Sequence, residues 1–307
     1  MQSPALQVQV RPVERSEVPQ VIEFLRGGFQ NLAHRSTDDL RRLFEYRWPN
    51  VPEKPYLGFA LWSGDAVVGY LGAIYAERSL GDAVVKVANF GVWYVDPDFR
   101  TSSIRLMTSM LSDKNYSFLA LTASPTVGKV LEAFGCKIID YGKRVYLPWH
   151  VRRDLCRFSP KFITDTRQIA EVVGAEDQQF LKDHLQCELK HYVFQVGDEY
   201  TYFILKRRTF PGVAAFPKFP VRKVRLMWYP CMEVLHLRNP NLAIANWGPQ
   251  VATILRRERV LGLVVAERIL GPDPPVGARL EHRNYLLART PLKATVDSLY
   301  SELALLT

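Results

Sequence analysis

The sequence predicts an α/β protein with a mixed (α+β) sheet, in which one layout of strands and helices occurs twice. Short apolar runs with the alternation of strands are separated by amphipathic helical segments along the chain. The first half has the order β-α-α-β-β-β-α-β-α-β, and the second half repeats part of this order. The length of 307 residues also favours two domains, at ~150 residues each.

The domain boundaries are predicted from composition. Residues 148–166 contain Pro148, a Ser-Pro pair and many charges, which is typical of a linker or crossover. We therefore expect a first domain at residues 1–147 and a divergent second copy of the same layout at residues 167–307.

Composition and charge exclude several classes of protein. The apolar fraction of 48% and the aromatic fraction of 12% are those of a globular chain. No run approaches the ~18 apolar residues of a membrane-spanning helix, and the N-terminus lacks the pattern of a secretory signal. The four cysteines are scattered without a CxxC pair, so we expect reduced thiols and a cytoplasmic location.

The net charge of +9 raises the question of a polyanionic partner. The Lys and Arg residues form only short clusters and no nucleic-acid-binding motif accompanies them, so nucleic acid is not the expected partner. The six histidines show no HxxxH or HExxH spacing, so no metal site is expected. His184 and His191 lie seven residues apart on a predicted helix, where they could share a face.

In the first half, a short strand at residues 8–10 precedes two helices with Ser16 and Ser36 as candidate N-caps. A three-strand meander follows, and Gly91 interrupts its third strand. Glycine inside a strand usually marks a bulge or a close approach of the backbone. The three meander strands are predicted at residues 58–62, 66–76 and 83–95. The elements predicted after them are a helix on Ile104–Leu111, a strand at 116–121, a helix that begins at Ser124 and a strand at 136–139.

The second half is predicted to begin with a helix and a hairpin and to end with a helix. A long stretch at residues 230–245 shows no regular pattern. The other predicted elements are a helix at residues 177–191, hairpin strands at 192–196 and 199–205, a strand at 223–229, a helix capped by Asn246, a strand at 261–266 and a helix on Val296, Leu299, Tyr300 and Leu303.

The stretch at residues 89–111 carries the predicted chemistry, because it reads as a strand, an anion-binding loop and a helix. The start of a helix carries unpaired N–H groups and roughly half a positive charge, which favours an anion there. The short side chains of Thr101, Ser102 and Ser103 let a phosphate approach the backbone, and Arg100 and Arg105 would add charge-assisted hydrogen bonds. The alternative is that Ser102 is only a helix N-cap with charged residues near it.

The first-half order and this loop together resemble the GNAT superfamily of acyl-CoA-dependent N-acyltransferases, from Val8 to about Val145. Residues 89–95 match the family's fourth strand, residues 100–105 its pyrophosphate loop, and Phe134-Gly135-Cys136 the usual turn after its fourth helix. The resemblance implies that acyl-CoA is bound by the bulged strand, the loop and the residue after the fifth strand. These positions are Val92, Trp93, Val95, Arg100, Thr101, Ser102, Ser103, Ile104, Arg105 and Ser124.

The sequence also departs from the family pattern. Ser103 and Arg105 stand where small glycines are usual, and Ser124 stands where an Asn often contacts the cofactor. Leu131 occupies the position of a Tyr that often serves as general acid. These departures imply that the cofactor binds differently, that another acid is used, or that the first half has lost activity.

The general base must accept a proton from an attacking amine, directly or through water. Glu77 is the first candidate, at the end of a meander strand, and Asp96 is the second, although an exposed strand-end carboxylate and a turn residue are the simpler interpretations. Asn89 could orient a water molecule. Tyr94 could donate a proton, although an aromatic residue in a strand is more often part of the core.

We therefore expect an acyltransferase of the EC 2.3.1 class that moves an acyl group from CoA to an amine by direct attack. The expected acceptor is a small molecule, with amino sugars and polysaccharide precursors favoured by the resemblance to two-domain relatives. One alternative is a Fem-type aminoacyl or peptidyl transferase that uses aminoacyl-tRNA. Another is a non-catalytic protein that binds or senses acyl-CoA.

Overall fold

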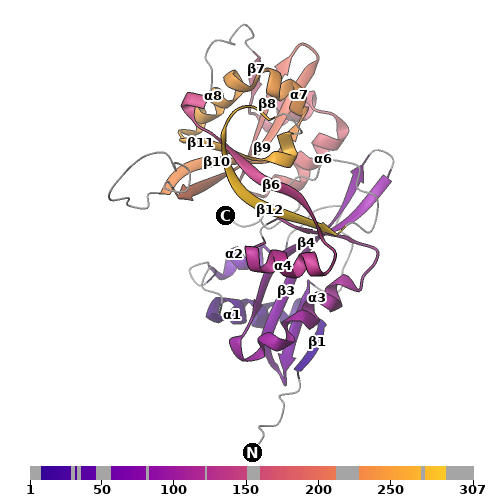
Figure 1. Cartoon of the computed structure of the whole chain (residues 1–307). Coiled ribbons are helices and arrows are strands. Elements are labelled where there is room, and N and C mark those ends of the chain that lie inside the picture. Colours follow the sequence, from indigo (N-terminus) through magenta and orange to yellow (C-terminus); the bar gives the residue numbers. More distant parts are fainter. Residues whose placement is uncertain are drawn as a thin grey trace, which may run out of the picture. The chain divides into compact units, whose positions relative to one another are not determined.

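The structure is a computed structural model of the chain, and it describes residues 8–28, 32, 36–45, 57–80, 83–121, 123–150, 160–211, 228–270 and 274–287. The chain divides into two compact units, each described here by itself (Figure 1). Unit 1 comprises Met1–Lys137 with Tyr285–Ala294 and Tyr300–Thr307. Unit 2 comprises Ile138–Asn284 with Thr295–Leu299.

Unit 1 is built on a mixed sheet with the strand order β1-β2-β3-β4-β5-β12. The first four strands are antiparallel neighbours, β5 runs parallel to β4, and the end of β12 runs antiparallel to β5. The strands are β1 (Val8–Pro12), β2 (Phe59–Ser63), β3 (Ala66–Leu80), β4 (Ala83–Val95), β5 (Ser117–Ala120) and the end of β12 from Tyr285 onward, where β12 as a whole spans Ala278–Leu287.

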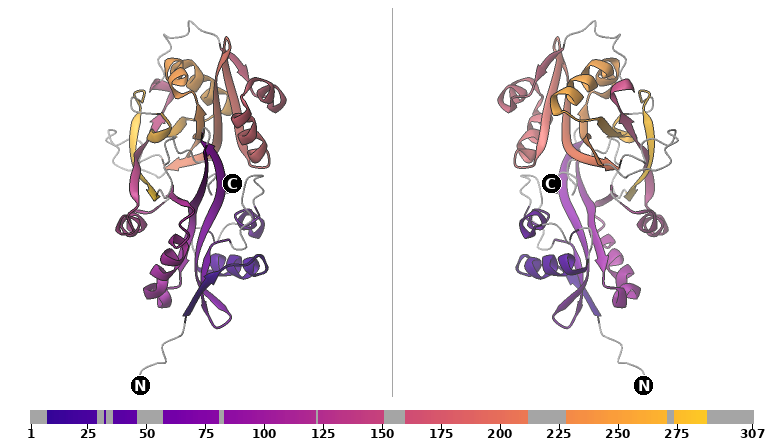
Figure 2. Two further views of the ribbon diagram at one scale, coloured as in Figure 1. Left: turned by 90° about the vertical axis from the view of Figure 1, so that its right-hand side faces the viewer. Right: turned by 90° about the vertical axis from the view of Figure 1, so that its left-hand side faces the viewer.

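Helices cover both faces of the unit 1 sheet, with α1 and α2 on one face and α3 and α4 on the other (Figure 2). The helices are α1 (Val18–Gly28), α2 (Thr37–Arg41), α3 (Ser103–Leu111) and α4 (Pro125–Ala133). Predicted capping residues act as expected: Ser36 and Ser124 accept hydrogen bonds from the N–H groups of Asp39 and Val127. Gly135 ends α4 with a φ of +83°, which favours glycine.

The first helix of unit 1 starts differently from the prediction. Ser16 is not its cap, because Arg15–Glu17 forms a 3₁₀ turn that leads into α1. Glu14 caps this turn, and the Glu17 carboxylate accepts a hydrogen bond from the Glu14 N–H at 2.9 Å. The prediction used the usual preference for Ser and overlooked the pair of glutamates.

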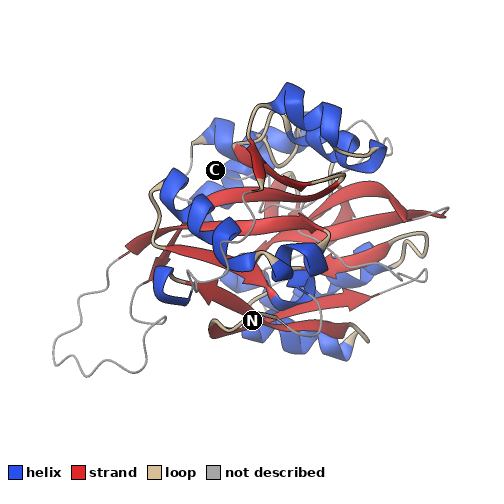
Figure 3. Cartoon of the chain, turned by 90° about the horizontal axis from the view of Figure 1, so that it is seen from above, coloured by secondary structure: helices blue, strands red, loops and turns tan. Residues whose placement is uncertain are grey.

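The strands of unit 2 follow the order β6-β11-β10-β9-β8-β7. Figure 3 distinguishes the helices (blue) and strands (red) of the chain. The strands are β6 (Lys137–Tyr146), β7 (Lys161–Ile163), β8 (Leu189–Val196), β9 (Glu199–Pro211), β10 (Trp228–Arg238) and β11 (Gly262–Ala266). The helices are α5 (Thr166–Val172), α6 (Ala175–His184), α7 (Pro240–Ala245), α8 (Trp247–Glu258) and α9 (Glu267–Leu270).

The α/β class with a mixed sheet is therefore confirmed, but the division of the chain differs from the predicted boundaries. Residues 143–146 of β6 pair with β11, so β6 belongs to the sheet of unit 2 and not to residues 1–147 as one domain. Tyr285–Leu287 at the end of β12 pairs with β5 in unit 1. Each sheet includes a strand from the other half of the sequence, and no composition signal marks such an exchange.

The predicted linker at residues 148–166 also contains regular structure, because β7 begins the sheet of unit 2 inside it. In the second half, α6 ends at His184, and His191 lies on β8. The stretch at 230–245 is not irregular, since β10 and α7 occupy most of it. The predicted C-terminal helix and most of the strand at 223–229 lie outside the described residues.

The described residues contain no helix that is long and apolar enough to cross a membrane. They also contain no group of three or more His, Cys, Asp or Glu side chains placed to hold a metal ion.

Candidate active site in the first unit

The two parallel strands of unit 1 separate after a short ladder. β4 and β5 form three residue pairs, from Val87 with Ser117 to Asn89 with Leu119. β4 then continues to Val95 and stays paired with β3 on its other side. No strand in the described part of the chain pairs with the β5-facing edge of β4 beyond Asn89. This opening offers backbone N–H and C=O groups to an extended ligand.

A β-bulge interrupts β4 beside this opening. Phe90 pairs with Ala73 and Trp93 pairs with Leu71, so two residues of β4 lie opposite one residue of β3. The bulge predicted at Gly91 is therefore confirmed. A bulge turns backbone groups out of the ladder and re-aims the side chains that follow it, and bulges are common beside active sites.

Asn89 is the last residue of β4 that pairs with β5, and its side chain is fully buried. Its Nδ2 donates a hydrogen bond to the Phe90 carbonyl oxygen at 3.3 Å. Its Oδ1 has no hydrogen-bond partner among the described residues. A buried, unpaired amide oxygen costs about 1–3 kcal/mol. Asn89 lies at the apex of the opening, the point where β4 and β5 begin to separate, so its Oδ1 is well placed to accept a hydrogen bond from a bound molecule.

The three predicted catalytic residues do not share one face of the sheet. Tyr94 packs in the same cluster as Tyr70 and helix α1. Asn89 pairs with Ile74, which lies on the same side of β3 as Tyr70, so Asn89 also faces α1. Glu77 is an odd number of residues from Ile74 and therefore faces the other side. The structure thus brings Asn89 and Tyr94 to one face and places Glu77 on the opposite one.

Glu77 has an ion-pair partner on the neighbouring strand. Its Oε1 lies 3.5 Å from Nζ of Lys86, its cross-strand neighbour. Its side chain is 30% exposed, as is typical of a partly solvated surface pair. This arrangement favours a structural interpretation of Glu77 over a role as general base.

The Tyr94 ring lies against the C-terminal end of α1. Its centroid is 5.3 Å from that of Phe24. A Cβ atom at Gly28 would come within 2.6 Å of the Tyr94 hydroxyl oxygen, so a larger residue requires the ring to move. The position of Tyr94 therefore depends on glycine at position 28.

Replacing Gly28 by Ala should displace the Tyr94 ring and lower the free energy of unfolding by about 1–3 kcal/mol. Gly27 offers a matched control, because a Cβ atom there meets no heavy atom within 4 Å. Gly27→Ala should stabilise α1 by up to ~1 kcal/mol. Urea denaturation of both variants measures the difference, and equal effects would contradict the proposed contact.

The Tyr94 ring borders an open cleft of about 570 Å³. The cleft is lined by the carboxylates of Glu23, Asp65 and Asp96, and no Lys or Arg of the described segments is among its lining residues. Such a lining favours a cation over an anion. Anion binding at the end of β4 would therefore depend on the residues that follow Asp96.

The segment expected to be the phosphate loop is helical. Pro97–Ser102 forms a 3₁₀ helix that continues directly into α3. The Asp96 side chain caps it by accepting a hydrogen bond from the Asp98 N–H at 3.1 Å. The Ser103 N–H donates to the Arg100 carbonyl oxygen. Some of the N–H groups expected to bind phosphate are therefore used within the helix.

The side chains of this segment point to several partners. Arg100 and Thr101 are exposed, and Ile104 is 43% exposed. Arg105 Nη1 donates to the carbonyl oxygen of Val8 on β1 at 3.0 Å. Arg100 and Arg105 are both exposed, but Arg105 also ties α3 to the first strand.

The remaining predicted cofactor residues fall into two groups. Val92, Trp93 and Val95 lie on the part of β4 with the open edge, so their backbone groups border the opening. Ser124 uses its hydroxyl to cap α4, accepting a hydrogen bond from the Val127 N–H at 3.3 Å.

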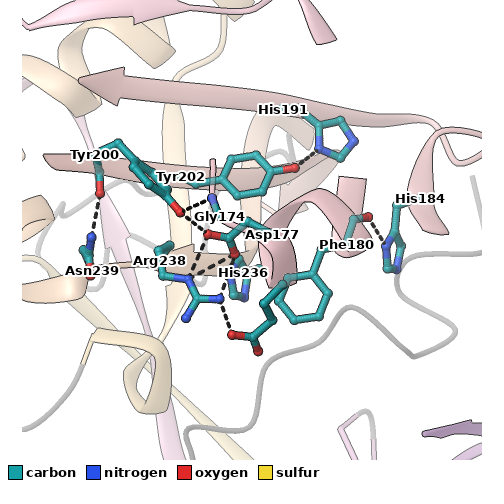
Figure 4. Close-up of polar contacts among 11 residues, drawn as sticks. Gly174, Asp177, Phe180, His184, His191, Tyr200, Tyr202, His236, Arg238 and Asn239 are labelled. Carbon is teal, nitrogen blue, oxygen red and sulfur yellow. Dashed lines mark hydrogen bonds and ion pairs between the residues drawn. The ribbon is translucent and has the colours of Figure 1, made fainter. Parts of the chain in front are cut away.

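Unit 2 contains the same strand separation. β10 pairs with β11 from Cys231 to Val234 only, and a register shift between Val234 and His236 marks a bulge. Beyond it, however, the side chains of β10 form a buried polar network with α6 and β9 (Figure 4). Because this network fills the α6 side of β10, we assign the candidate site to unit 1.

The network is centred on Asp177 of α6, which is 1% exposed. Arg238 donates to its carboxylate from Nε at 3.0 Å and from Nη2 at 2.8 Å, and the Tyr200 hydroxyl donates at 2.7 Å (Figure 4). His236 Nε2 lies 3.7 Å from Asp177 Oδ1. Burial alone would raise the pKa of Asp177, but the nearby His236 imidazole and the hydrogen bonds from Arg238 and Tyr200 lower it below its ordinary value.

His191 lies beside this network in an apolar setting. Its Nδ1 is 2.7 Å from the Tyr202 hydroxyl, and its Nε2 has no hydrogen-bond partner among the described residues. Burial, and then the nearby His184, lower the pKa of His191 to about 3. The folded protein therefore holds this imidazole neutral.

Acid should therefore destabilise the protein partly through His191. Between pH 6.5 and about 3 the unfolded chain binds a proton at this residue that the folded protein does not, so stability falls as the pH drops through this range. His191→Gln should flatten the dependence of the urea midpoint on pH there. If the urea midpoint of His191→Gln kept the same dependence on pH, the pKa of His191 would have to be the same in the folded and unfolded states. His150→Gln serves as the control.

Sequence reasoning missed the Asp177 network. The signal was present as Asp177, Tyr200 and Arg238, but it is spread over a helix and two strands whose pairing the sequence does not show. The spacing of His184 and His191 suggested a shared helical face, whereas the two residues lie on different elements.

Several known structures are similar to this chain. A GCN5-related N-acetyltransferase from Anabaena variabilis superposes with a TM-score of 0.57 at 11% identity, over 92% of this chain and 73% of that one. A GCN5-related N-acetyltransferase from Kribbella flavida superposes with a TM-score of 0.54 at 15% identity, over 92% of this chain and 72% of that one. The fold is that of the GCN5-related N-acetyltransferases. A candidate acetyltransferase from Pyrococcus horikoshii matches with a TM-score of 0.51 at 12% identity, over 100% of this chain and 98% of that one.

No protein-family model and no curated protein matches the sequence. At identities this low, the structural matches show the GNAT fold, and the activity has to be argued from the site.

Proposed function

We propose that the protein is an acyl-CoA-dependent N-acyltransferase whose active site is the opening between β4 and β5 of unit 1. The observation that carries this proposal is the separation of the two parallel strands after Asn89, next to the bulge in β4. An extended amide-containing arm, such as the pantetheine of CoA, can pair with the free strand edge in the manner of an added strand.

Each group around the opening has a role in this proposal. Backbone N–H groups near Val92 and Trp93 would polarise the acyl carbonyl, as donors do in an oxyanion hole. The Asn89 Oδ1 would accept a hydrogen bond from the attacking amine or from a water that carries its proton away. Arg100 would contact a phosphate of the cofactor. Acyl-CoA would supply the activated acyl group as a thioester.

The acceptor is proposed to be an amine of a small molecule, with an amino sugar as the first choice. The proposed chemistry requires an unprotonated amine near Asn89. Neither a Ser nor a Cys nucleophile is part of the proposal, since the amine would attack the thioester carbonyl directly. The C–N bond of the amide would form as the C–S bond breaks, and CoA would leave as a thiolate that takes up the proton released by the amine.

Calorimetry with CoA and acetyl-CoA tests the proposed site. We expect binding in the micromolar range, and Arg100→Ala should weaken it about tenfold through loss of one charge-assisted contact. Arg42→Ala is the control, because Arg42 is also an exposed arginine of unit 1 but lies at the end of α2. No binding at millimolar CoA would refute the proposal, and full affinity in Arg100→Ala would refute the role of Arg100.

A further inference from the structure

Two stacked phenylalanines lie next to the point where β4 and β5 separate, on the face of the sheet opposite α1. Phe90 follows Asn89 on β4, and Phe118 lies on β5. Their rings are stacked, with centroids 5.5 Å apart and an interplanar angle of 17°. Phe90 is 6% exposed and Phe118 is 1% exposed, so the pair belongs to the packed interior of unit 1.

Further aromatic residues on β3 and just before β5 pack around this stack. Ala88 is the cross-strand neighbour of Tyr75 on β3 and of Phe118 on β5, so both rings flank one small side chain. Tyr75 also meets Tyr116 edge to face, with centroids 5.1 Å apart. All of these side chains are buried. The stack is therefore held in place and cannot turn aside without disturbing its neighbours.

The apex is closed on its other face as well. Asn89 and its neighbour Ile74 face α1, and they are 0% and 3% exposed. An acyl group that reaches the apex thus meets Asn89 on one side and the stacked rings of Phe90 and Phe118 on the other.

We propose that the Phe90–Phe118 stack sets the acyl specificity of the enzyme, restricting it to short groups such as acetyl and propionyl. This inference rests on the proposed function of the opening. A longer chain would have to displace aromatic rings from a close-packed interior, and each excluded methylene lowers affinity by roughly tenfold or more. Phe118 and Phe90 are therefore specificity-determining residues.

Calorimetry with free CoA, acetyl-CoA and octanoyl-CoA tests the proposal without requiring the acceptor. The unmodified protein should bind CoA and acetyl-CoA with similar affinity and octanoyl-CoA at least about tenfold more weakly. Phe118→Ala should remove this penalty, so that octanoyl-CoA binds as tightly as acetyl-CoA or more tightly, with affinity for free CoA unchanged. Phe118→Leu should give a partial change if the alanine variant does not fold.

Phe203→Leu provides the matched control, because Phe203 is a fully buried phenylalanine in the core of unit 2. It should lose stability but keep the preference for short chains. Octanoyl-CoA binding as tightly as acetyl-CoA to the unmodified protein would overturn the inference while leaving the proposed function intact. Absence of binding to free CoA would instead refute the proposed function on which the inference rests.

Discussion

Replacing Arg238 by Met should lower the free energy of unfolding by about 3–5 kcal/mol, the usual cost of breaking a buried ion pair by removing one partner. The Asp177 carboxylate is 1% exposed and accepts hydrogen bonds from two different nitrogens of Arg238. Without the guanidinium, a negative charge remains buried between α6 and β10 with fewer donors to stabilise it. Urea denaturation measures the loss.

Arg256→Met is the control, since Arg256 is exposed at the end of α8, and it should change stability by less than about 0.5 kcal/mol. The double variant Asp177→Leu/Arg238→Met should recover much of the loss, because an apolar pair leaves no buried charge. Equal instability of the single and double variants would show that Arg238 acts through packing rather than through charge.

The same network predicts the sign of a pH effect. The hydrogen bonds from Arg238 and Tyr200 hold the pKa of Asp177 in the folded protein below the ordinary value of 3.8, so its stabilising contribution is complete well above that pH. It is lost as the pH falls through the folded-state pKa. The stability difference between the unmodified protein and Asp177→Asn should therefore be constant above pH 3.8 and shrink below it. A difference that grows as the pH falls below 3.8 would contradict this assignment.

Local patterns were enough to predict most elements of the first half. Ser36 and Ser124 cap helices, Gly91 lies at a bulge and Gly135 ends a helix, because each acts through backbone geometry within a few residues. The α/β class with a mixed sheet follows from the same signals. Long-range pairing gave no such signal, so the exchange of β6 and β12 between the halves was not predicted.

The candidate site shows the same limit. The sequence predicted Asn89 and Tyr94 as neighbours of a bulged strand, and the structure places both on the α1 face. The sequence interpretation also grouped Glu77 with these two residues. Successive side chains of a strand point to opposite faces of the sheet, so a shift of one residue changes the face, and Glu77 lies on the face opposite α1. The segment at Pro97–Ser102 was expected to be an open loop because its Pro and Asp residues favour turns. These residues also begin helices, and here they do so.

Asn89 gives the sharpest test of the proposed site, because function and stability should respond in opposite directions. Asn89→Leu removes a fully buried amide whose Oδ1 has no partner among the described residues. Replacing it by an apolar group of similar size should leave the free energy of unfolding unchanged or raise it by about 1 kcal/mol. Acyl transfer should fall by about 10²–10³-fold, as expected when a group that contacts the reacting atoms is lost.

The measurement combines urea denaturation with turnover of acetyl-CoA over a panel of amines, and free CoA affinity serves as a check that the opening is intact. Ser117 to Ala is a matched control, since Ser117 is also a fully buried polar residue of the β4–β5 ladder but lies at the far end from the opening. A stable Asn89→Leu protein with undiminished turnover would refute the proposed role of Asn89. Residues kept for function commonly lower stability, so a gain in stability with loss of turnover is the result that marks the apex of the opening as the active site.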